Sequence, residues 1–180
     1  MAKVTLASDW LAGCAGCHMS VLDLDERLLD VLALVELRAT PITDLKQPDV
    51  TGVTVGMLEG AVANSATEEV AKRMRERCGV LIALGDCAVF GGVPAMRNTL
   101  CPKAAMQRAY VETESTVDGK IPDDPELATM LDTVKPLDQV VKVDVYIPGC
   151  PPSADVILSV LGKLLAGEKP QIPSEKLDWH

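Results

Sequence analysis

Two cysteines near the start of the chain are the residues whose type and spacing most clearly indicate chemistry. They lie in the segment Gly13-Cys14-Ala15-Gly16-Cys17-His18, after an apolar run and before a stretch with helical periodicity. A C-x-x-C pair of this kind is found in thioredoxin-like dithiols, in zinc sites, in c-type haem attachment when His follows, and in iron–sulfur sites. The first turn of a helix favours thiolates, so we expect Cys14 and Cys17 to be reactive or metal-binding.

The other four cysteines fall into two groups. Cys87, in Gly85-Asp86-Cys87-Ala88, and Cys150, in Pro148-Gly149-Cys150-Pro151-Pro152, each follow an apolar run that predicts a strand. Cys78 instead precedes a predicted strand and is interpreted as a small buried residue at the opposite edge of the sheet. Cys101 is interpreted as a turn cysteine without a metal role.

The elements that must position these cysteines alternate between strands and helices. We expect strands at residues 4–8, 35–38, 52–58, 80–84 and 143–147, and helices at residues 20–35, 65–78 and 153–166. Ser20 with Asp23, and Ser65 with Glu68, predict capping boxes, and Gly79 predicts a glycine C-cap. Residues 93–141 form a Pro-rich excursion, in which we expect short helices near 103–113 and 125–133.

This alternation predicts an α/β fold with a mainly parallel sheet, in which ligands bind beyond the carboxyl ends of the strands. Cys14, Cys17, Cys87 and Cys150 all follow strand ends, so one crevice can receive all four. Only one pair is local in the sequence, whereas structural zinc sites usually combine two local pairs. The spacing therefore favours a [4Fe-4S] cluster over zinc, and Gly beside each cysteine allows backbone N–H groups to approach the sulfurs.

A haem site or a simple dithiol would leave Cys87 and Cys150 without a purpose, which argues against both. Glu59 ends another predicted strand at the same edge of the sheet. Its carboxylate has two open interpretations: a proton relay beside a redox site, or a structural group that caps the following segment or pairs with an Arg. No phosphate-binding loop and no nucleophile with a free His base is present, so the chain has a redox site without substrate chemistry.

Composition limits the classes of function. The chain has 180 residues and a formal net charge of −9, which argues against nucleic acid as a partner. No apolar run reaches the roughly 18 residues of a membrane span, and we expect a cytoplasmic protein without a leader. Six cysteines in that compartment are read as metal or redox positions, and with only two His any metal site must be rich in thiolates. We expect one domain over residues 1–167 and a tail over 168–180.

Four motifs in order resemble the small subunit of [NiFe]-hydrogenases. They are W-L-x-G-C-x-G-C at Trp10 to Cys17, L-E-G-A at Leu58 to Ala61, G-D-C-A-x-x-G-G at Gly85 to Gly92, and P-G-C-P-P at Pro148 to Pro152. Related respiratory complex I subunits have adjacent cysteines in the first motif, so the C-x-x-C here favours hydrogenase. The resemblance implies a flavodoxin-like, doubly wound domain.

By this resemblance, Cys14, Cys17, Cys87 and Cys150 hold one proximal [4Fe-4S] cluster that faces a Ni-Fe centre in a partner large subunit. The chain resembles the short small subunits of cytoplasmic bidirectional, NAD(P)-reducing hydrogenases. That similarity implies a diaphorase partner with FMN and further Fe-S clusters. Glu59 would then lie near the large subunit. The first alternative is a subunit of a methanogen-type hydrogenase. The second is a protein that binds zinc or acts through a dithiol.

Overall fold

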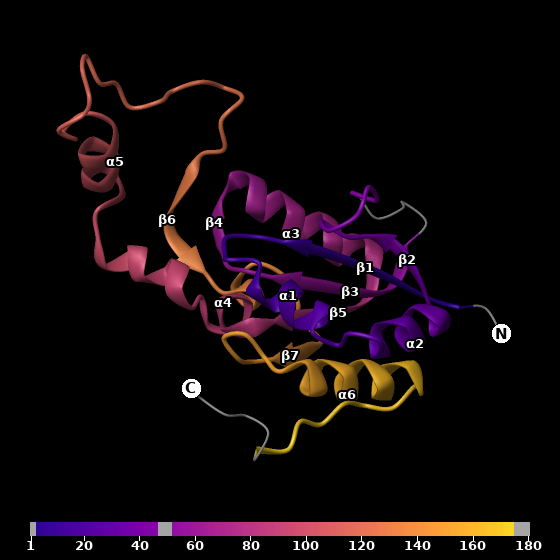
Figure 1. Ribbon diagram of the computed structural model, residues 1–180. Coiled ribbons are helices and arrows are strands. Elements are labelled where there is room, and N and C mark those ends of the chain that lie inside the picture. Colours follow the sequence, from indigo (N-terminus) through magenta and orange to yellow (C-terminus); the bar gives the residue numbers. More distant parts are fainter. Residues whose placement is uncertain (1–2, 47–51, 175–180) are drawn as a thin grey trace.

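In the computed structural model, which describes residues 3–46 and 52–174, five parallel strands form the central sheet (Figure 1). Their spatial order is β2-β1-β3-β5-β7. The strands are β1 (Val4–Trp10), β2 (Val35–Ala39), β3 (Val53–Glu59), β5 (Cys78–Leu84) and β7 (Val145–Ile147). All five coincide with predicted strands, and the order is that of flavodoxin-like folds. The prediction of a doubly wound α/β fold is confirmed.

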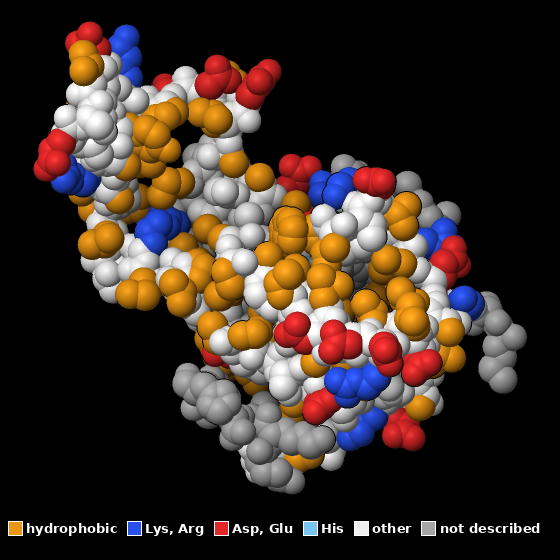
Figure 2. Space-filling view, viewed as in Figure 1, with side chains coloured by type: hydrophobic (Ala, Val, Ile, Leu, Met, Phe, Trp, Pro, Cys, Tyr) orange, Lys and Arg blue, Asp and Glu red, His pale blue; other side chains and the backbone are white. Residues whose placement is uncertain are grey.

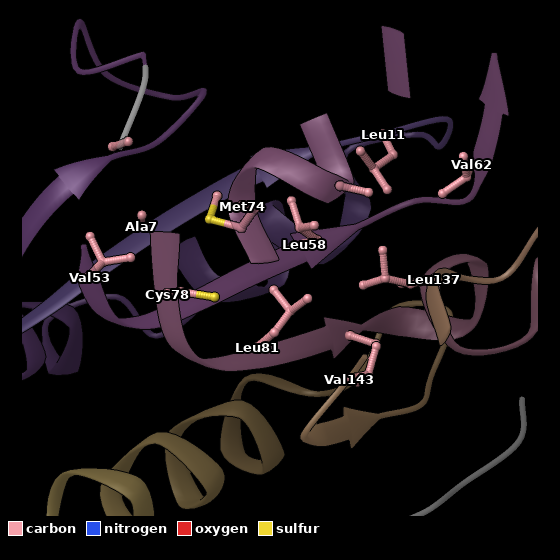
Figure 3. Close-up of a cluster of buried hydrophobic side chains, with 14 residues drawn as sticks. Ala7, Leu11, Val53, Leu58, Val62, Met74, Cys78, Leu81, Leu137 and Val143 are labelled. Atoms are coloured by element: carbon pink, nitrogen blue, oxygen red, sulfur yellow. The ribbon is translucent and has the colours of Figure 1, made fainter. Parts of the chain in front are cut away.

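Hydrophobic side chains cover both faces of this sheet. Along β5, Leu81 and Ala83 enter one core, while Ile82 and Leu84 enter the other. The first core packs beneath α3 (Ser65–Arg77), and Figure 3 shows its side chains between that helix and the strands. The second core packs beneath α2 (Arg27–Leu34) and α6 (Ala154–Leu165). The continuous apolar run in β5 therefore reflects burial on both faces.

The helical segment that follows the first cysteines differs from the prediction. One helix was expected from Ser20, but α1 (Gly16–Leu22) begins four residues earlier and a turn separates it from α2. Asp25 in that turn has φ +51°, which interrupts the helix. Ser20 caps nothing, because its hydroxyl donates a hydrogen bond to the carbonyl of Pro152 at 2.5 Å. The predicted Ser20–Asp23 capping box is wrong.

The two ends of α3 also differ from the prediction. Its N-cap is Asn64, whose side chain accepts a hydrogen bond from Thr67 N–H at 2.9 Å, so the capping box lies one residue before the predicted Ser65–Glu68 pair. At its other end, Cys78 is both the C-cap and the first residue of β5. Gly79 lies inside that strand, so the helix passes into the strand without a glycine cap.

Helix α4 (Gly85–Phe90) directly follows β5, and the excursion at residues 93–141 then contains η1 (Val93–Thr99), α5 (Pro102–Tyr110), β6 (Met130–Lys135) and η2 (Leu137–Gln139). The helix expected near 103–113 is present as α5, whereas the helix expected near 125–133 is wrong. Residues 130–135 instead pair antiparallel with β4 (Val62–Asn64). The Asn98 side chain bonds both the N–H and the carbonyl of Val134. Figure 1 shows α5 and its flanking loops projecting from the body as an arm.

The helices in the described part of the chain were compared with the length and hydrophobicity of a membrane span. None of the helices at residues 3–46 and 52–174 combines the length and the apolar character that a bilayer span requires.

Candidate metal centre

The four predicted cysteines lie together at the carboxyl edge of the sheet. Cys14 and Cys17 follow β1, Cys87 lies in α4 directly after β5, and Cys150 follows β7. The thiol of Cys17 interacts electrostatically with the thiols of the other three. Cys14 and Cys150 are exposed, while Cys17 and Cys87 are partly buried. The structure thus brings four thiols from three loops into one group that is open to the surface.

Polar side chains fix these three loops to one another. Asp86 connects the loops of Cys87 and Cys150, because its N–H donates to the carbonyl of Gly149 at 2.9 Å and its carboxylate accepts from Gly149 N–H at 2.7 Å. Ser20 connects α1 to the Cys150 loop through Pro152. Sequence reasoning missed both roles, since Asp86 and Ser20 bond to residues more than 60 positions away.

Glu59 is buried beside the same group, with 2% of its surface exposed. Its carboxylate accepts a hydrogen bond from the backbone N–H of His18 at 2.7 Å, so it caps the first turn of α1 from the end of β3. Nδ1 of His18 lies 2.8 Å from the same oxygen. Glu59 thus has a structural role, but it differs from the predicted one: the carboxylate caps a helix that precedes it in the chain, and its ionic neighbour is His18 and not an Arg. This capping explains why α1 begins at Gly16 although its N-cap residue, Ala15, has no side chain that can cap it.

His18 is buried at 1% exposure, and its ring faces other protein groups. Nε2 lies 3.0 Å from the hydroxyl of Ser8, and the ring meets Trp10 edge to face at 5.7 Å between centroids. Its position after Cys17 completes a haem-attachment pattern in the sequence. In the structure, however, its two ring nitrogens lie against Glu59 and Ser8, as expected for a structural residue.

Burial controls the ionisation of the partly buried thiols. Desolvation raises the pKa of Cys17 far above its ordinary value, and the neighbouring Glu59 carboxylate adds to this rise. Desolvation also raises the pKa of Cys87, although the backbone N–H of Val93 opposes it. At Cys17, burial thus opposes the preference for a thiolate that the first turn of a helix gives. A bound metal reverses such a shift because a coordinating thiol is deprotonated.

Two glycines make room around the sulfur atoms. Gly85 has φ +81°, and a Cβ at this position would collide with Sγ of Cys17. Gly92 has φ +47°, and its Cβ would lie 2.9 Å from Sγ of Cys87. Two backbone N–H groups also approach the thiols: Gly16 at 3.4 Å from Sγ of Cys14, and Val93 at Cys87. The backbone and two of its N–H groups therefore lie close to the sulfur atoms, and such contacts suit a cluster held by thiolates.

The two remaining cysteines lie elsewhere. Cys78 is buried in the core at the amino end of β5, below α3. Cys101 is exposed at the N-cap of α5, on the arm. Neither is among the groups that act on Cys17, which agrees with the sequence interpretation of both.

Comparison with known proteins gives consistent matches. The profile of the family described as NADH ubiquinone oxidoreductase, 20 Kd subunit, matches residues 14–164. The delta subunit of the NAD-reducing hydrogenase HoxS from Cupriavidus necator is 41% identical over 96% of this chain and 83% of its own length. A subunit of the F420-non-reducing hydrogenase from Methanothermobacter marburgensis is 36% identical over 97% of this chain and 58% of its own length.

Solved structures agree with these matches. A chain from an NAD⁺-reducing [NiFe]-hydrogenase in the H2-reduced state superposes with a TM-score of 0.95 at 37% identity, covering 99% of this chain and all of the other. A [NiFeSe]-hydrogenase chain from Dm. baculatum shares the fold at a TM-score of 0.58 and 16% identity. The family profile carries the name of a respiratory subunit, whereas these relatives are hydrogenase subunits. The chain therefore belongs to the NADH ubiquinone oxidoreductase 20 kDa subunit family, in its hydrogenase small-subunit branch.

Proposed function

We propose that this chain is the electron-transfer small subunit of a cytoplasmic, NAD(P)-linked [NiFe]-hydrogenase. Cys14, Cys17, Cys87 and Cys150 would hold one [4Fe-4S] cluster. In this proposal, a partner large subunit oxidises H2 at its Ni-Fe centre, and a diaphorase with FMN and further Fe-S clusters reduces NAD(P)⁺, reversibly. When bound, a cluster of this type accepts and releases one electron at a time. The observation that carries the proposal is the group of four thiols from three loops, two of which lie against glycine backbone.

The spacing of the thiols supports a cluster more than a zinc ion. Only Cys14 and Cys17 form a local pair in the sequence, whereas structural zinc sites usually combine two local pairs. Zinc holds its thiolates about 2.3 Å from a single centre. A four-iron cluster spreads its thiolates further apart, since each binds a different iron atom. The three loops would hold the sulfurs at this wider spacing through Asp86, Ser20 and Glu59.

The surface beside the thiols supports a large-subunit partner. Phe90, Val93 and Met96 follow Cys87 on α4 and η1, and their side chains are 56%, 65% and 68% exposed. Trp10, at the end of β1, is 41% exposed. Figure 2 shows apolar side chains along the η1 region where the arm leaves the body. Exposed apolar surface beside a redox site is expected where another subunit covers it.

Glu59 remains part of the proposal as a proton relay. Its carboxylate is buried beside Cys17 and contacts both the backbone and the ring of His18. Glu59→Gln keeps an oxygen that can accept from His18 N–H but removes the carboxylate. We expect this variant to lower H2 oxidation while the cluster spectrum is retained. If both H2 oxidation and the cluster spectrum were unchanged, Glu59 would have no role as a proton relay and would only cap α1.

The identity of the electron acceptor distinguishes the two hydrogenase alternatives. The higher identity to the NAD-reducing delta subunit favours NAD(P), while the similarity to the F420-non-reducing hydrogenase subunit keeps the methanogen type as the second candidate.

The test is to purify the tagged chain anaerobically with its partners and to assay H2-dependent reduction of NAD⁺ and NADP⁺. Cys87→Ser and Cys150→Ser should abolish this activity, whereas Cys101→Ser should leave it intact. Activity that survives loss of Cys87 contradicts the assignment.

A further inference from the structure

An apolar groove of about 160 Å³ opens on the face of the sheet that carries α1 and α2. We call it the leucine groove; its walls come from α1, α2, β2 and the turn at residues 40–43. None of the four clustered cysteines lines it. Its main aliphatic lining residues are Leu22, Leu28, Leu32, Leu37, Ile42 and Leu161.

The outer edge of the leucine groove is exposed apolar surface. Leu22 and Leu32 are each 39% exposed and Ile42 is 42% exposed. Helix α2 buries only Val31 fully, while Leu29 and Leu34 are 69% and 60% exposed. A short amphipathic helix normally turns most of its leucines to the core. Leucines that remain outside, beside an apolar groove, mark a binding surface for another protein.

Acidic residues border this surface. Asp23, Asp25, Glu26 and Asp30 lie in the turn between α1 and α2 and on α2, and all four are exposed. The Arg in the same stretch, Arg27, pairs with Asp155 of α6 at 2.6 Å. Figure 2 shows a row of acidic side chains over this part of the molecule, next to apolar ones. A partner that fits both features presents apolar side chains flanked by Lys or Arg.

The floor of the leucine groove includes a residue of α1, the helix that carries Cys17. His18 and Ser8 line the groove and lie 3.0 Å apart at Nε2 and Oγ. His18 is adjacent to Cys17 in the chain. A protein seated in the groove would therefore lie against α1, the helix that carries Cys17, on a surface that Cys14 and Cys150 do not line.

We infer that the leucine groove is the docking site of the subunit that receives electrons from this chain. The occupant is a segment of that subunit with one or two large apolar side chains, flanked by basic residues. A cavity of roughly 150 Å³ accommodates a group the size of a benzene ring, which matches such a side chain. This inference rests on the proposed function, because a carrier without its own substrate site needs an electron donor and an acceptor. The apolar surface at Phe90 and Val93 is proposed for the donor, and the groove is a separate apolar surface, bordered by acidic residues, on which the acceptor can bind.

The test uses the complex purified through a tag on this chain. Asp23→Lys/Glu26→Lys reverses two exposed charges, and Leu32→Gln changes the apolar wall. The matched control is Glu69→Lys/Glu76→Lys on α3, which covers the opposite face of the sheet. Native mass spectrometry identifies the retained subunits. H2-dependent reduction of benzyl viologen and of NAD(P)⁺ are measured side by side at two salt concentrations.

We expect both groove variants to lose the acceptor subunit and to lower NAD(P)⁺ reduction by about tenfold or more. The reason is that complementary charges at an interface speed association, and changes to them weaken the complex. Viologen reduction and the large subunit should be retained, and the α3 control should match the wild type. Retention of the acceptor subunit in both variants overturns the inference. Loss of the large subunit instead, or of a second copy of this chain, also overturns it. Failure of the proposed function itself is distinguishable, because the wild-type complex would then lack H2-dependent viologen reduction.

Discussion

The space beside the Cys17 sulfur can be tested with a single methyl group. Gly85 has a positive φ and would collide with Sγ of Cys17 if it carried a Cβ. Two other glycines serve as controls that separate backbone strain from steric collision as causes of the expected loss of stability. Gly167 has φ +74° with no neighbouring atom within 4 Å of an added Cβ, and Gly162, inside α6, likewise has none within 4 Å.

The three alanine variants should give different free energies of unfolding. Gly162→Ala should stabilise the protein by about 0.5–1 kcal/mol, because Ala is the better helix former. In Gly167→Ala, left-handed backbone strain of about 1–2 kcal/mol is partly offset by lower entropy of the unfolded chain, which leaves a net loss of about 1 kcal/mol. Gly85→Ala adds an overpacking cost of about 1–3 kcal/mol, so its net loss should be about 2–4 kcal/mol.

Urea unfolding of the three variants and the wild type, with iron content measured on the same samples, checks these values. We predict that only Gly85→Ala loses iron, because only this methyl group enters the space beside a proposed cluster ligand. Equal stability of Gly85→Ala and Gly167→Ala, with full iron in both, would refute the reasoning. The space beside Cys17 would then have no role in cluster binding.

Three further predictions concern the scaffold. Asp144 is partly buried, which raises its pKa, but bonds from Leu81 N–H at 2.9 Å and Arg75 at 2.5 Å outweigh this, so its pKa lies below the ordinary value. Its contribution to stability should be lost as pH falls below about 4, and Asp144→Asn should flatten this part of the stability curve in acid titration. Asn64→Ala should cost about 0.5–2 kcal/mol in urea unfolding by removing the α3 cap. Leu58→Ala, at a fully buried core position, should cost about 2–5 kcal/mol, whereas Leu29→Ala should stay within about 0.5 kcal/mol.

The strands and the convergence of the cysteines could be predicted because both follow from local patterns. Val80 to Leu84 is a continuous apolar run, which predicts a strand buried on both faces. Parallel topology then brings every strand's carboxyl end to one edge, so Cys14, Cys87 and Cys150 had to meet there. No long-range contact needs to be known for this step.

The wrong predictions of helix starts, of the helix near 125–133 and of the α3 cap have causes that lie far away in the sequence or in a single residue. Helix α1 starts at Gly16 because Glu59 caps it from β3, 41 positions away, which no local cap signal reveals. Residues 130–135 form a strand because β4 and Asn98 offer hydrogen bonds to their backbone. The capping box of α3 lies one residue earlier because Asn64 with Thr67 and Ser65 with Glu68 are overlapping patterns, and the sequence does not choose between them.

The ionisation of Cys17 was also beyond the sequence. Desolvation raises the pKa of this thiol and the Glu59 carboxylate adds to the rise, and both depend on how the chain folds around it. The role of Asp86 could not be predicted either, because its two hydrogen bonds, which connect the Cys87 and Cys150 loops, are made to Gly149, 63 positions away. Such roles depend on the final position of a partner element.

The central claim is that four cysteines of this chain hold one four-iron cluster. The most direct measurement compares iron and acid-labile sulfide in the anaerobically purified complex with those in its Cys87→Ser/Cys150→Ser variant, together with EPR after reduction. We predict that the variant has about four fewer irons and four fewer sulfides per complex and lacks one reduced-cluster signal. Equal iron and sulfide contents in the two complexes, or a difference in zinc instead, would contradict it.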